Sequence, residues 1–329
     1  MVEMTGTNLL EIKGLKKYFN VHRGTLYAVD DVTVSIPQGK TLGLVGESGC
    51  GKSTLGRVVI GLLEATAGEV FFKGENVLLY DEKQKKKFRQ NAQIVFQDPF
   101  SSLNPRMSVF QLIAEPLLIN EACGSRAELE SRVGELMDTV HLAERLVTSF
   151  PHELDGGRRQ RIGIARALAL NPDFIVLDEP VSALDVCVQA QILNLLGDLK
   201  REHGYTYLFI SHNLSVVRYV SDEVAVMYLG QVVEQASNTE LFKNPLHPYT
   251  QALLSAVPVI DLDHKKERII LEGDVPSPID PPSGCRFSPR CRWRRDLCSV
   301  ETPRLTEIEP GHHVSCHFAG HLEPNAAER

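Results

Sequence analysis

The sequence predicts an α/β fold with a parallel sheet, and three observations carry this prediction. Along residues 174–227, runs of branched and aromatic residues alternate with helical patterns, which is typical of parallel α/β domains. Residues 174–177, Phe-Ile-Val-Leu, are continuously apolar, as in a strand buried on both faces. Residues 46–54 form a glycine-rich stretch between a predicted strand and a predicted helix, an arrangement that suits phosphate binding.

The predicted elements follow one another along the chain. Strands rich in branched and aromatic residues are expected at residues 9–13, 32–36, 41–45, 69–72, 92–97, 174–177, 207–210 and 223–227. Helices are expected from charge and periodicity at residues 55–63, 81–91, within 107–147, at 163–170, 188–202 and within 239–256. Residues 257–329 are expected to be rich in loops.

Length and composition indicate a globular chain of two domains. The chain has 329 residues, of which 43% are hydrophobic and 23% charged, and domains usually hold roughly 100–200 residues. Lysine and arginine number 35 against 42 acids, a net charge of −7, so no basic excess points to nucleic acid. No apolar stretch is long enough to span a bilayer, and the N-terminus has no apolar segment of a secretory signal. We therefore expect a chain that stays inside the cell.

A phosphate-binding loop is predicted at residues 46–54, Gly-Glu-Ser-Gly-Cys-Gly-Lys-Ser-Thr. Its glycines let the backbone bend so that successive N–H groups point at phosphate oxygens. The Lys52 ammonium is expected to contact the β- and γ-phosphates, and the Ser53 hydroxyl to bind Mg²⁺. The candidate ATP-binding residues of this loop are Gly46, Glu47, Ser48, Gly49, Cys50, Gly51, Lys52, Ser53 and Thr54.

Two acids end the apolar run at residues 174–177. Asp178 suits the Walker B role, in which a carboxylate at a strand end holds Mg²⁺ through water. The adjacent Glu179 can orient or deprotonate an attacking water. Glu179 is therefore the predicted catalytic residue.

Together these motifs resemble the ATP-binding-cassette (ABC) transporter ATPases. The likeness assigns Gln97, in Val-Phe-Gln-Asp-Pro, to the Q-loop, which contacts the metal and senses the membrane subunits. It assigns residues 182–185, Ser-Ala-Leu-Asp, to the D-loop, and His212 to the histidine that contacts the γ-phosphate. Phe19, with Tyr18 as the alternative, is the aromatic residue expected to stack on adenine.

The resemblance also implies an architecture. It is that of a P-loop NTPase with a RecA-like core, a helical subdomain and a small C-terminal extension. We expect the ATPase domain over residues 1–235, with the helical subdomain at about 100–165, and the extension over residues 236–329. Most of the prolines lie in this last part of the chain.

Three further stretches are similar to the importer ATPases for dipeptides and oligopeptides: residues 95–106, residues 244–249 and the C-terminal cysteines. This likeness implies an ATP-hydrolysing subunit, with ATP sandwiched at a dimer interface, on the cytoplasmic face of the inner membrane. Its implied partners are a second ABC ATPase subunit in a heterodimer, two membrane-spanning permeases and an extracytoplasmic solute-binding protein.

Three other functions are alternatives. Nickel importers share much of this sequence. A soluble cassette ATPase of DNA repair or translation usually has long coiled-coil insertions or two cassettes in tandem, which this sequence lacks. A non-enzymatic scaffold would not need Lys52, Asp178 and Glu179.

One motif departs from the family. The signature Leu-Ser-Gly-Gly-Gln, which binds the γ-phosphate held by the opposite subunit, here reads Leu-Asp-Gly-Gly-Arg at residues 154–158. Asp155, Gly156 and Gly157 are thus expected to reach the nucleotide across the dimer. The Asp155 carboxylate would repel a triphosphate. Arg158 can compensate for this charge, and Asp155 can also cap the following helix, so compensated function and a weakened composite site are both open.

Four cysteines lie in the last 45 residues: Cys285, Cys291, Cys298 and Cys316. Inside a cell, clustered cysteines more often bind metal than form disulfides. Their spacing is wider than that of usual zinc sites. Four thiolates suffice for a 4Fe-4S cluster, and importer ATPases with this tail often bind one. We therefore expect a cluster, with zinc or unliganded thiols as alternatives. No sequence feature connects it to the phosphate-binding loop, so its expected role is structural or in partner docking.

Overall fold

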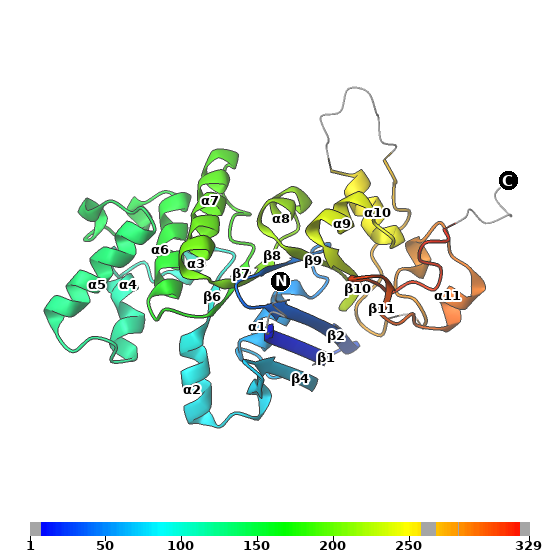
Figure 1. Cartoon of the computed structure of the whole chain (residues 1–329), viewed down its shortest axis with the longest axis horizontal. Helices are drawn as coiled ribbons and strands as arrows, with labels where there is room; N and C mark the ends of the chain where they lie inside the picture. The colour runs from blue at the N-terminus through cyan, green and yellow to red at the C-terminus, as the bar shows by residue number, and fades with distance from the viewer. Residues whose placement is uncertain (1–7, 258–267, 282, 323–329) are drawn as a thin grey trace, which may run out of the picture. The chain divides into compact units, whose positions relative to one another are not determined.

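The computed structural model describes residues 8–257, 268–281 and 283–322 (Figure 1). The chain divides into two compact units, which are described separately. One holds Met1–Leu10, Ile36–Lys40 and Phe72–Ile210, and the other holds Glu11–Ser35, Thr41–Phe71 and Ser211–Arg329. Each unit is therefore built from segments that are distant in sequence.

In the unit that contains residues 41–71, two groups of strands form the framework. The first has β1 (Asn8–Val21) between β2 (Gly24–Pro37) and β4 (Ala67–Phe72). In the second, β3 (Thr41–Val45) pairs in parallel with β9 (Glu223–Tyr228), because both strands are almost entirely apolar and buried. Three antiparallel strands continue from β9 in the order β10 (Gln231–Ser237), β12 (His312–Val314) and β11 (Thr306–Glu309).

The helices of this unit are short. They are α1 (Lys52–Val59), α8 (Leu214–Val220), α9 (Asn238–Lys243), α10 (Pro248–Ser255) and α11 (Asp296–Val300), with a 3-10 turn η4 (Ser288–Arg290). α8 packs on β3, and α9 packs on β10. These contacts place the helices that follow the strands against the same sheet.

In the other unit, three parallel strands lie in the order β6 (Ala92–Val95), β7 (Phe174–Asp178) and β8 (Thr206–Ile210). All five residues of β7 are buried, as the apolar run predicted. Two helices flank these strands in sequence, α2 (Glu82–Asn91) and α7 (Val186–His203). β5 (Glu75–Asn76) and the 3-10 turn η1 (Val77–Leu79) precede them.

Four further helices of this unit pack on one another: α3 (Pro99–Ser102), α4 (Val109–Ile119), α5 (Arg126–Thr139) and α6 (Gly156–Leu168) (Figure 1). Short 3-10 turns, η2 (Glu144–Leu146) and η3 (Pro151–Glu153), connect α5 to α6. α4 and α5 begin where serines accept a backbone N–H, Ser108 and Ser125. The helices occupy the range in which a helical subdomain is predicted.

The α/β fold with parallel strands is confirmed. The strands β10, β11 and β12 were not predicted, and β11 and β12 show that part of residues 257–329, expected to be rich in loops, extends a sheet. The boundary predicted at 235/236 falls inside β10. In the described part of the chain, no helix is both long and apolar enough to span a bilayer.

Candidate functional site

The phosphate-binding loop connects β3 to α1, as predicted, and two of its glycines cannot be replaced without a clash. Gly46 and Gly51 have φ angles of 155° and 107°. A Cβ on Gly46 would lie 2.1 Å from the carbonyl oxygen of Met227, and one on Gly51 would lie 1.9 Å from that of Ala28. The loop is therefore held against β2 and β9 by close backbone approach, which only glycine permits.

Lys52 folds back into this loop. Its side chain is 5% exposed, and Nζ donates hydrogen bonds to the carbonyl oxygens of Gly46 at 2.9 Å and Glu47 at 3.0 Å. Nζ also lies 3.6 Å from the Cys50 sulfur. Among the described residues its partners are carbonyl oxygens and a thiol, and phosphate oxygens in the loop would supply an anionic partner.

The other residues of the loop differ in exposure. Ser48 and Gly49 are exposed at the tip of the loop, while Cys50 is buried beneath it. Burial raises the pKa of the Cys50 thiol, and the Lys52 charge opposes this rise. Ser53 and Thr54 are half-buried in the first turn of α1. The hydroxyls and backbone N–H groups of a helix start are thus placed at the loop, as anion binding requires.

The predicted Walker B acids lie at the end of β7, in the other unit. Asp178 is 1% exposed. Glu179 has a positive φ of 47°, which its backbone contacts maintain: its N–H donates to the Ile210 carbonyl at 3.0 Å. The Glu179 carboxylate accepts a hydrogen bond from Gln97 Nε2 at 2.9 Å. The structure thus brings together the predicted catalytic acid and the predicted Q-loop glutamine.

The histidine predicted to contact the γ-phosphate is exposed. His212 immediately precedes Asn213, whose side chain caps α8 by accepting from the N–H groups of Ser215 and Val216. The residue before it, Ser211, donates its N–H to the Leu44 carbonyl on β3 at 3.1 Å. His212 is therefore positioned by a strand that leads directly into the phosphate-binding loop.

The two aromatic candidates for adenine stacking differ in their surroundings. Both lie on β1 and are half-buried. The Tyr18 hydroxyl donates to the Asp30 carboxylate, and burial together with this contact raises the pKa of Tyr18. The Phe19 ring has no hydroxyl to be held in this way, and Lys17 Nζ lies 4.8 Å from its centre. The assignment of Phe19 stays a prediction.

The altered signature motif begins α6. Asp155 accepts a hydrogen bond from the Arg158 backbone N–H at 2.8 Å and therefore caps the helix. Its carboxylate also lies 3.5 Å from Arg158 Nε, so the motif pairs an acid with a base, and whether this pair compensates for the lost serine or weakens the composite site stays open. A Cβ on Gly157 would lie 2.5 Å from the Val188 side chain, and a Cβ on Gly156 would lie 3.0 Å from the Leu184 side chain. Both glycines therefore permit close packing of these side chains against α6.

The C-terminal segment contacts the phosphate-binding loop, a contact that no sequence feature indicates. Arg290 Nη1 donates to the Glu47 carboxylate at 2.9 Å. The Tyr249 hydroxyl accepts the Glu47 backbone N–H at 2.9 Å, and Tyr249 is fully buried. Arg286 pairs with Asp30 and also donates to the Leu229 carbonyl. Sequence reasoning missed these partners because they lie up to 256 residues away from each other in the chain.

The four C-terminal cysteines are gathered in this unit without disulfides. The pKa of Cys285 is raised to about 11, mainly by burial and to a smaller extent by the thiols of Cys298 and Cys316. Burial likewise raises the pKa of Cys291 to about 12, with smaller effects from the other three thiols. All four thiols are thus within electrostatic reach of one another.

Backbone amides point at three of these sulfurs. The N–H groups of Phe287, Trp293 and Phe318 oppose the rise in pKa caused by burial at Cys285, Cys291 and Cys316, each from two residues further along the chain. Such N–H groups stabilise a thiolate. Among the described residues, no three cysteine sulfurs lie within 4.8 Å of one another.

Comparisons with known proteins identify the family of the chain. Residues 29–182 match the ABC transporter family, and residues 233–298 match the C-terminal region of oligopeptide/dipeptide transporters. The chain is similar to two oligopeptide transport ATP-binding proteins of Bacillus subtilis. It is 50% identical to AppF over 328 residues, covering 96% of this chain and 99% of AppF. It is 51% identical to OppF over 311 residues, covering 94% and 96% of the two chains.

A solved structure is similar as well. The ATP-binding cassette MJ0796, a dimer in a post-hydrolysis state bound to ADP and Pi, aligns with a TM-score of 0.64 and 29% identity. The alignment covers 70% of this chain and 98% of that one. Since relatives of about 50% identity match along nearly the whole length, the chain belongs to the ABC transporter ATPases, with the C-terminal region of the oligopeptide/dipeptide transporters.

Proposed function

We propose that this ATPase powers the import of di- and oligopeptides. The observation that carries the proposal is the combination of a phosphate-binding loop, with Lys52 buried in it, and a C-terminal segment of oligopeptide-transporter type that contacts this same loop through Tyr249 and Arg290. A C-terminal extension of oligopeptide-transporter type that contacts the phosphate-binding loop favours a peptide importer over an ABC ATPase that does not take part in transport.

The residues of the two motifs divide the work. Lys52 and the loop amides would hold the phosphates of ATP. The side chains of Ser53 and Gln97, with Asp178 acting through water, would hold a Mg²⁺ ion, which neutralises charge on the β- and γ-phosphates. Glu179 orients the attacking water and accepts its proton, and His212 contacts the γ-phosphate. Gln97, bonded to Glu179, keeps that carboxylate in place.

We infer that the chain works at the cytoplasmic face of the inner membrane. Without partners a chain of this kind moves no solute, so the proposal includes two permeases, a solute-binding protein outside the cytoplasm and a second ATPase subunit. We propose a heterodimer, in which each ATP lies between one subunit's P-loop and the other's signature motif.

The test is reconstitution of the full complex in lipid vesicles. Binding protein loaded with peptide is expected to raise ATP hydrolysis and to deliver peptide inside, because closure on ATP is coupled to the permeases. Binding protein loaded with Ni²⁺ serves as the comparison. Stimulation by Ni²⁺ alone would identify a nickel importer, and hydrolysis indifferent to both would contradict transport of either.

The signature motif predicts unequal ATP sites. The composite site that uses Asp155 should hydrolyse more slowly than the site that uses Lys52 and Glu179, because a carboxylate faces the triphosphate. The measurement is ATP turnover after the Walker B glutamate of each subunit is changed to glutamine separately. In the Glu179→Gln complex, the residual activity should be the smaller of the two.

A double variant supplies the control. Asp155→Ser with Arg158→Gln restores the family motif, and serine keeps the helix cap that Asp155 provides. This variant should raise the residual activity of the Glu179→Gln complex. Equal residual activities in the two single-site complexes, unchanged by the double variant, would show that the Asp155–Arg158 pair is a neutral variation.

We further propose a 4Fe-4S cluster at Cys285, Cys291, Cys298 and Cys316. The mutual proximity of four thiols and the amides directed at three of them support it. Among the described residues no three of these sulfurs lie within 4.8 Å of one another, whereas the sulfurs of a tetrahedral zinc site with bonds of about 2.3 Å lie about 3.8 Å apart. A cluster would supply folding free energy to a segment with few large apolar residues.

Iron content tests the cluster. Protein purified without oxygen is expected to be brown and to hold about four irons per chain. Each Cys→Ser change at the four positions should remove the iron, while Cys187→Ser, an exposed cysteine of α7, should leave it unchanged. Trp293 is the only tryptophan, so its fluorescence should rise as the nearby cluster is lost. Stoichiometric zinc without iron would contradict the cluster.

A further inference from the structure

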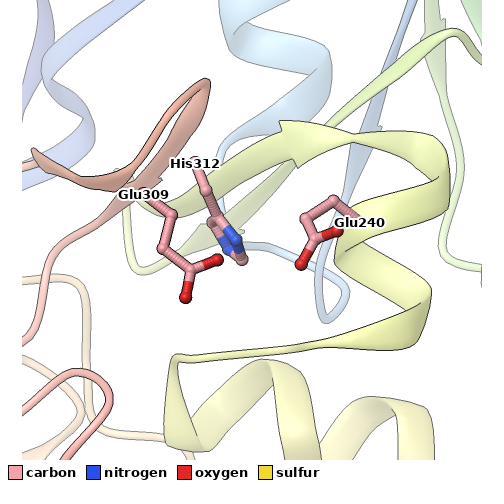
Figure 2. A group of neighbouring side chains, drawn as sticks. All are labelled: Glu240, Glu309 and His312. Carbon is pink, nitrogen blue, oxygen red and sulfur yellow. The ribbon is translucent and has the colours of Figure 1, made fainter.

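A second group of possible metal ligands is built from carboxylates and an imidazole instead of cysteines. Glu240 on α9, Glu309 at the end of β11 and His312 on β12 each offer one ligand atom, and these three atoms lie within 4.8 Å of one another. Figure 2 shows the His312 ring between the two carboxylates. The residues come from three different elements, so the fold rather than local sequence brings them together.

An independent observation points to a ligand here. His312 is fully buried, and its Nδ1 has no hydrogen-bond partner among the described residues. Its other ring nitrogen, Nε2, lies 2.8 Å from Oε1 of Glu234. A buried polar atom without a partner is costly, and such atoms in folded proteins call for an explanation.

The surroundings of Glu234 settle which nitrogen carries the proton. This carboxylate is fully buried and accepts the backbone N–H groups of Leu246 at 2.6 Å and His247 at 3.1 Å. Because a carboxylate accepts hydrogen bonds, His312 donates from Nε2 to Glu234. Nδ1 is then left with a lone pair, which is the form that binds a metal.

A carboxylate that receives the far N–H of a histidine is the arrangement found behind metal-bound imidazoles. It fixes the ring orientation and makes the ligating nitrogen more basic. Imidazole nitrogen favours transition-metal ions over Mg²⁺ and Ca²⁺, and one histidine with two carboxylates leaves a coordination position for water. At bond lengths of about 2.0–2.2 Å, ligand atoms of a tetrahedral site are about 3.4 Å apart. The ligand atoms here lie within 4.8 Å of one another, and rotation of the exposed Glu309 side chain can bring its carboxylate to the shorter distance that zinc requires.

We propose that Glu240, Glu309 and Nδ1 of His312 bind one Zn²⁺ ion, with Glu234 as the positioning residue behind the histidine. The ion would fasten the β11–β12 hairpin to α9. β12 pairs with β10 at two positions and all four residues of β11 are exposed, so the ion would add a link to this hairpin. The site uses oxygen and nitrogen donors and shares no ligand with the four cysteines.

Zinc counting on the full-length chain tests the site. The unchanged protein is expected to retain one more Zn²⁺ per chain after dialysis than Glu309→Gln or Glu240→Gln, since glutamine lacks the anionic ligand. Neither ligand is buried, so both variants should fold. Glu301→Gln, an exposed glutamate of the same C-terminal segment, is the matched control and should bind as the parent does. Because all four proteins keep their cysteines, zinc bound by thiols cancels in the comparison.

Two further measurements separate a metal site from a merely structural cluster. Added Zn²⁺ should raise the thermal unfolding temperature of the parent and of Glu301→Gln, but not that of Glu309→Gln. Glu234→Gln should weaken Zn²⁺ binding by about 10–100-fold, the usual effect of losing the carboxylate behind a ligating histidine. Equal zinc content in the parent, Glu240→Gln and Glu309→Gln would overturn the proposal.

Discussion

Replacing Glu179 with glutamine is expected to leave ATP binding intact and to lower the rate of hydrolysis by about 10²–10⁴-fold. Glu179 follows the buried Asp178 and is held in a left-handed backbone conformation, with Gln97 bonded to its carboxylate. Glutamine has the same size and can still accept that hydrogen bond, but it cannot take a proton from water. The complex should therefore bind ATP, close and stay closed.

The measurement is ATP turnover of the assembled transporter, together with the amount of nucleotide that stays bound after washing. Glu202→Gln, at an exposed position near the end of α7, is the control and should behave as the parent. Asp178→Asn should differ from both, because it weakens the hold on Mg²⁺ rather than the proton transfer. Parental turnover in the Glu179→Gln complex would remove Glu179 from the catalytic role.

Much of the fold could be predicted because its signals are local. β3 lies at the predicted residues, and β7 extends the predicted run by one residue, since continuous apolar stretches mark strands that are buried on both faces. β11 gave no such signal: its residues Thr-Glu-Ile-Glu are all exposed. β12 has three residues, too few to show a period. These strands depend on pairing with partners distant in sequence, which no local pattern reports.

The same contrast holds for the site. The phosphate-binding loop and the acids at the end of β7 are contiguous motifs, so residue type and spacing were enough to find them. Arg286 and Arg290 stand between the C-terminal cysteines in the sequence, where no local pattern indicates their partners. Their carboxylate partners, Asp30 and Glu47, lie 256 and 243 residues away along the chain. The structure thus shows that two arginines of the segment that contains the four C-terminal cysteines form ion pairs with β2 and with the phosphate-binding loop.

Arg286→Met is expected to destabilise the unit that holds the phosphate-binding loop by about 3 kcal/mol, the range for removing one partner of a buried ion pair. The side chains of Arg286 and Asp30 are only 9% and 14% exposed. Burial lowers the pKa of the Arg286 guanidinium, and Asp30 opposes this effect. In the variant, the Asp30 carboxylate still accepts hydrogen bonds from the Tyr18 hydroxyl and from Gln231. It no longer has a positively charged partner, so its buried charge is uncompensated.

The loss of stability is measured by thermal unfolding followed through Trp293 fluorescence. Trp293 is the only tryptophan and lies seven residues after Arg286, so it reports on the segment that contains the ion pair. Arg292→Met, an exposed arginine whose guanidinium stacks on Trp293, is the matched control for the change in side-chain chemistry. Adding Asp30→Asn to Arg286→Met should recover part of the stability, since it removes the uncompensated buried charge. If Arg286→Met unfolded at the parental temperature, or if Asp30→Asn made it still less stable, the pair would not hold the cysteine segment to β2. The expected recovery would instead identify this ion pair as the link between the C-terminal segment and the strand that supports the nucleotide loop.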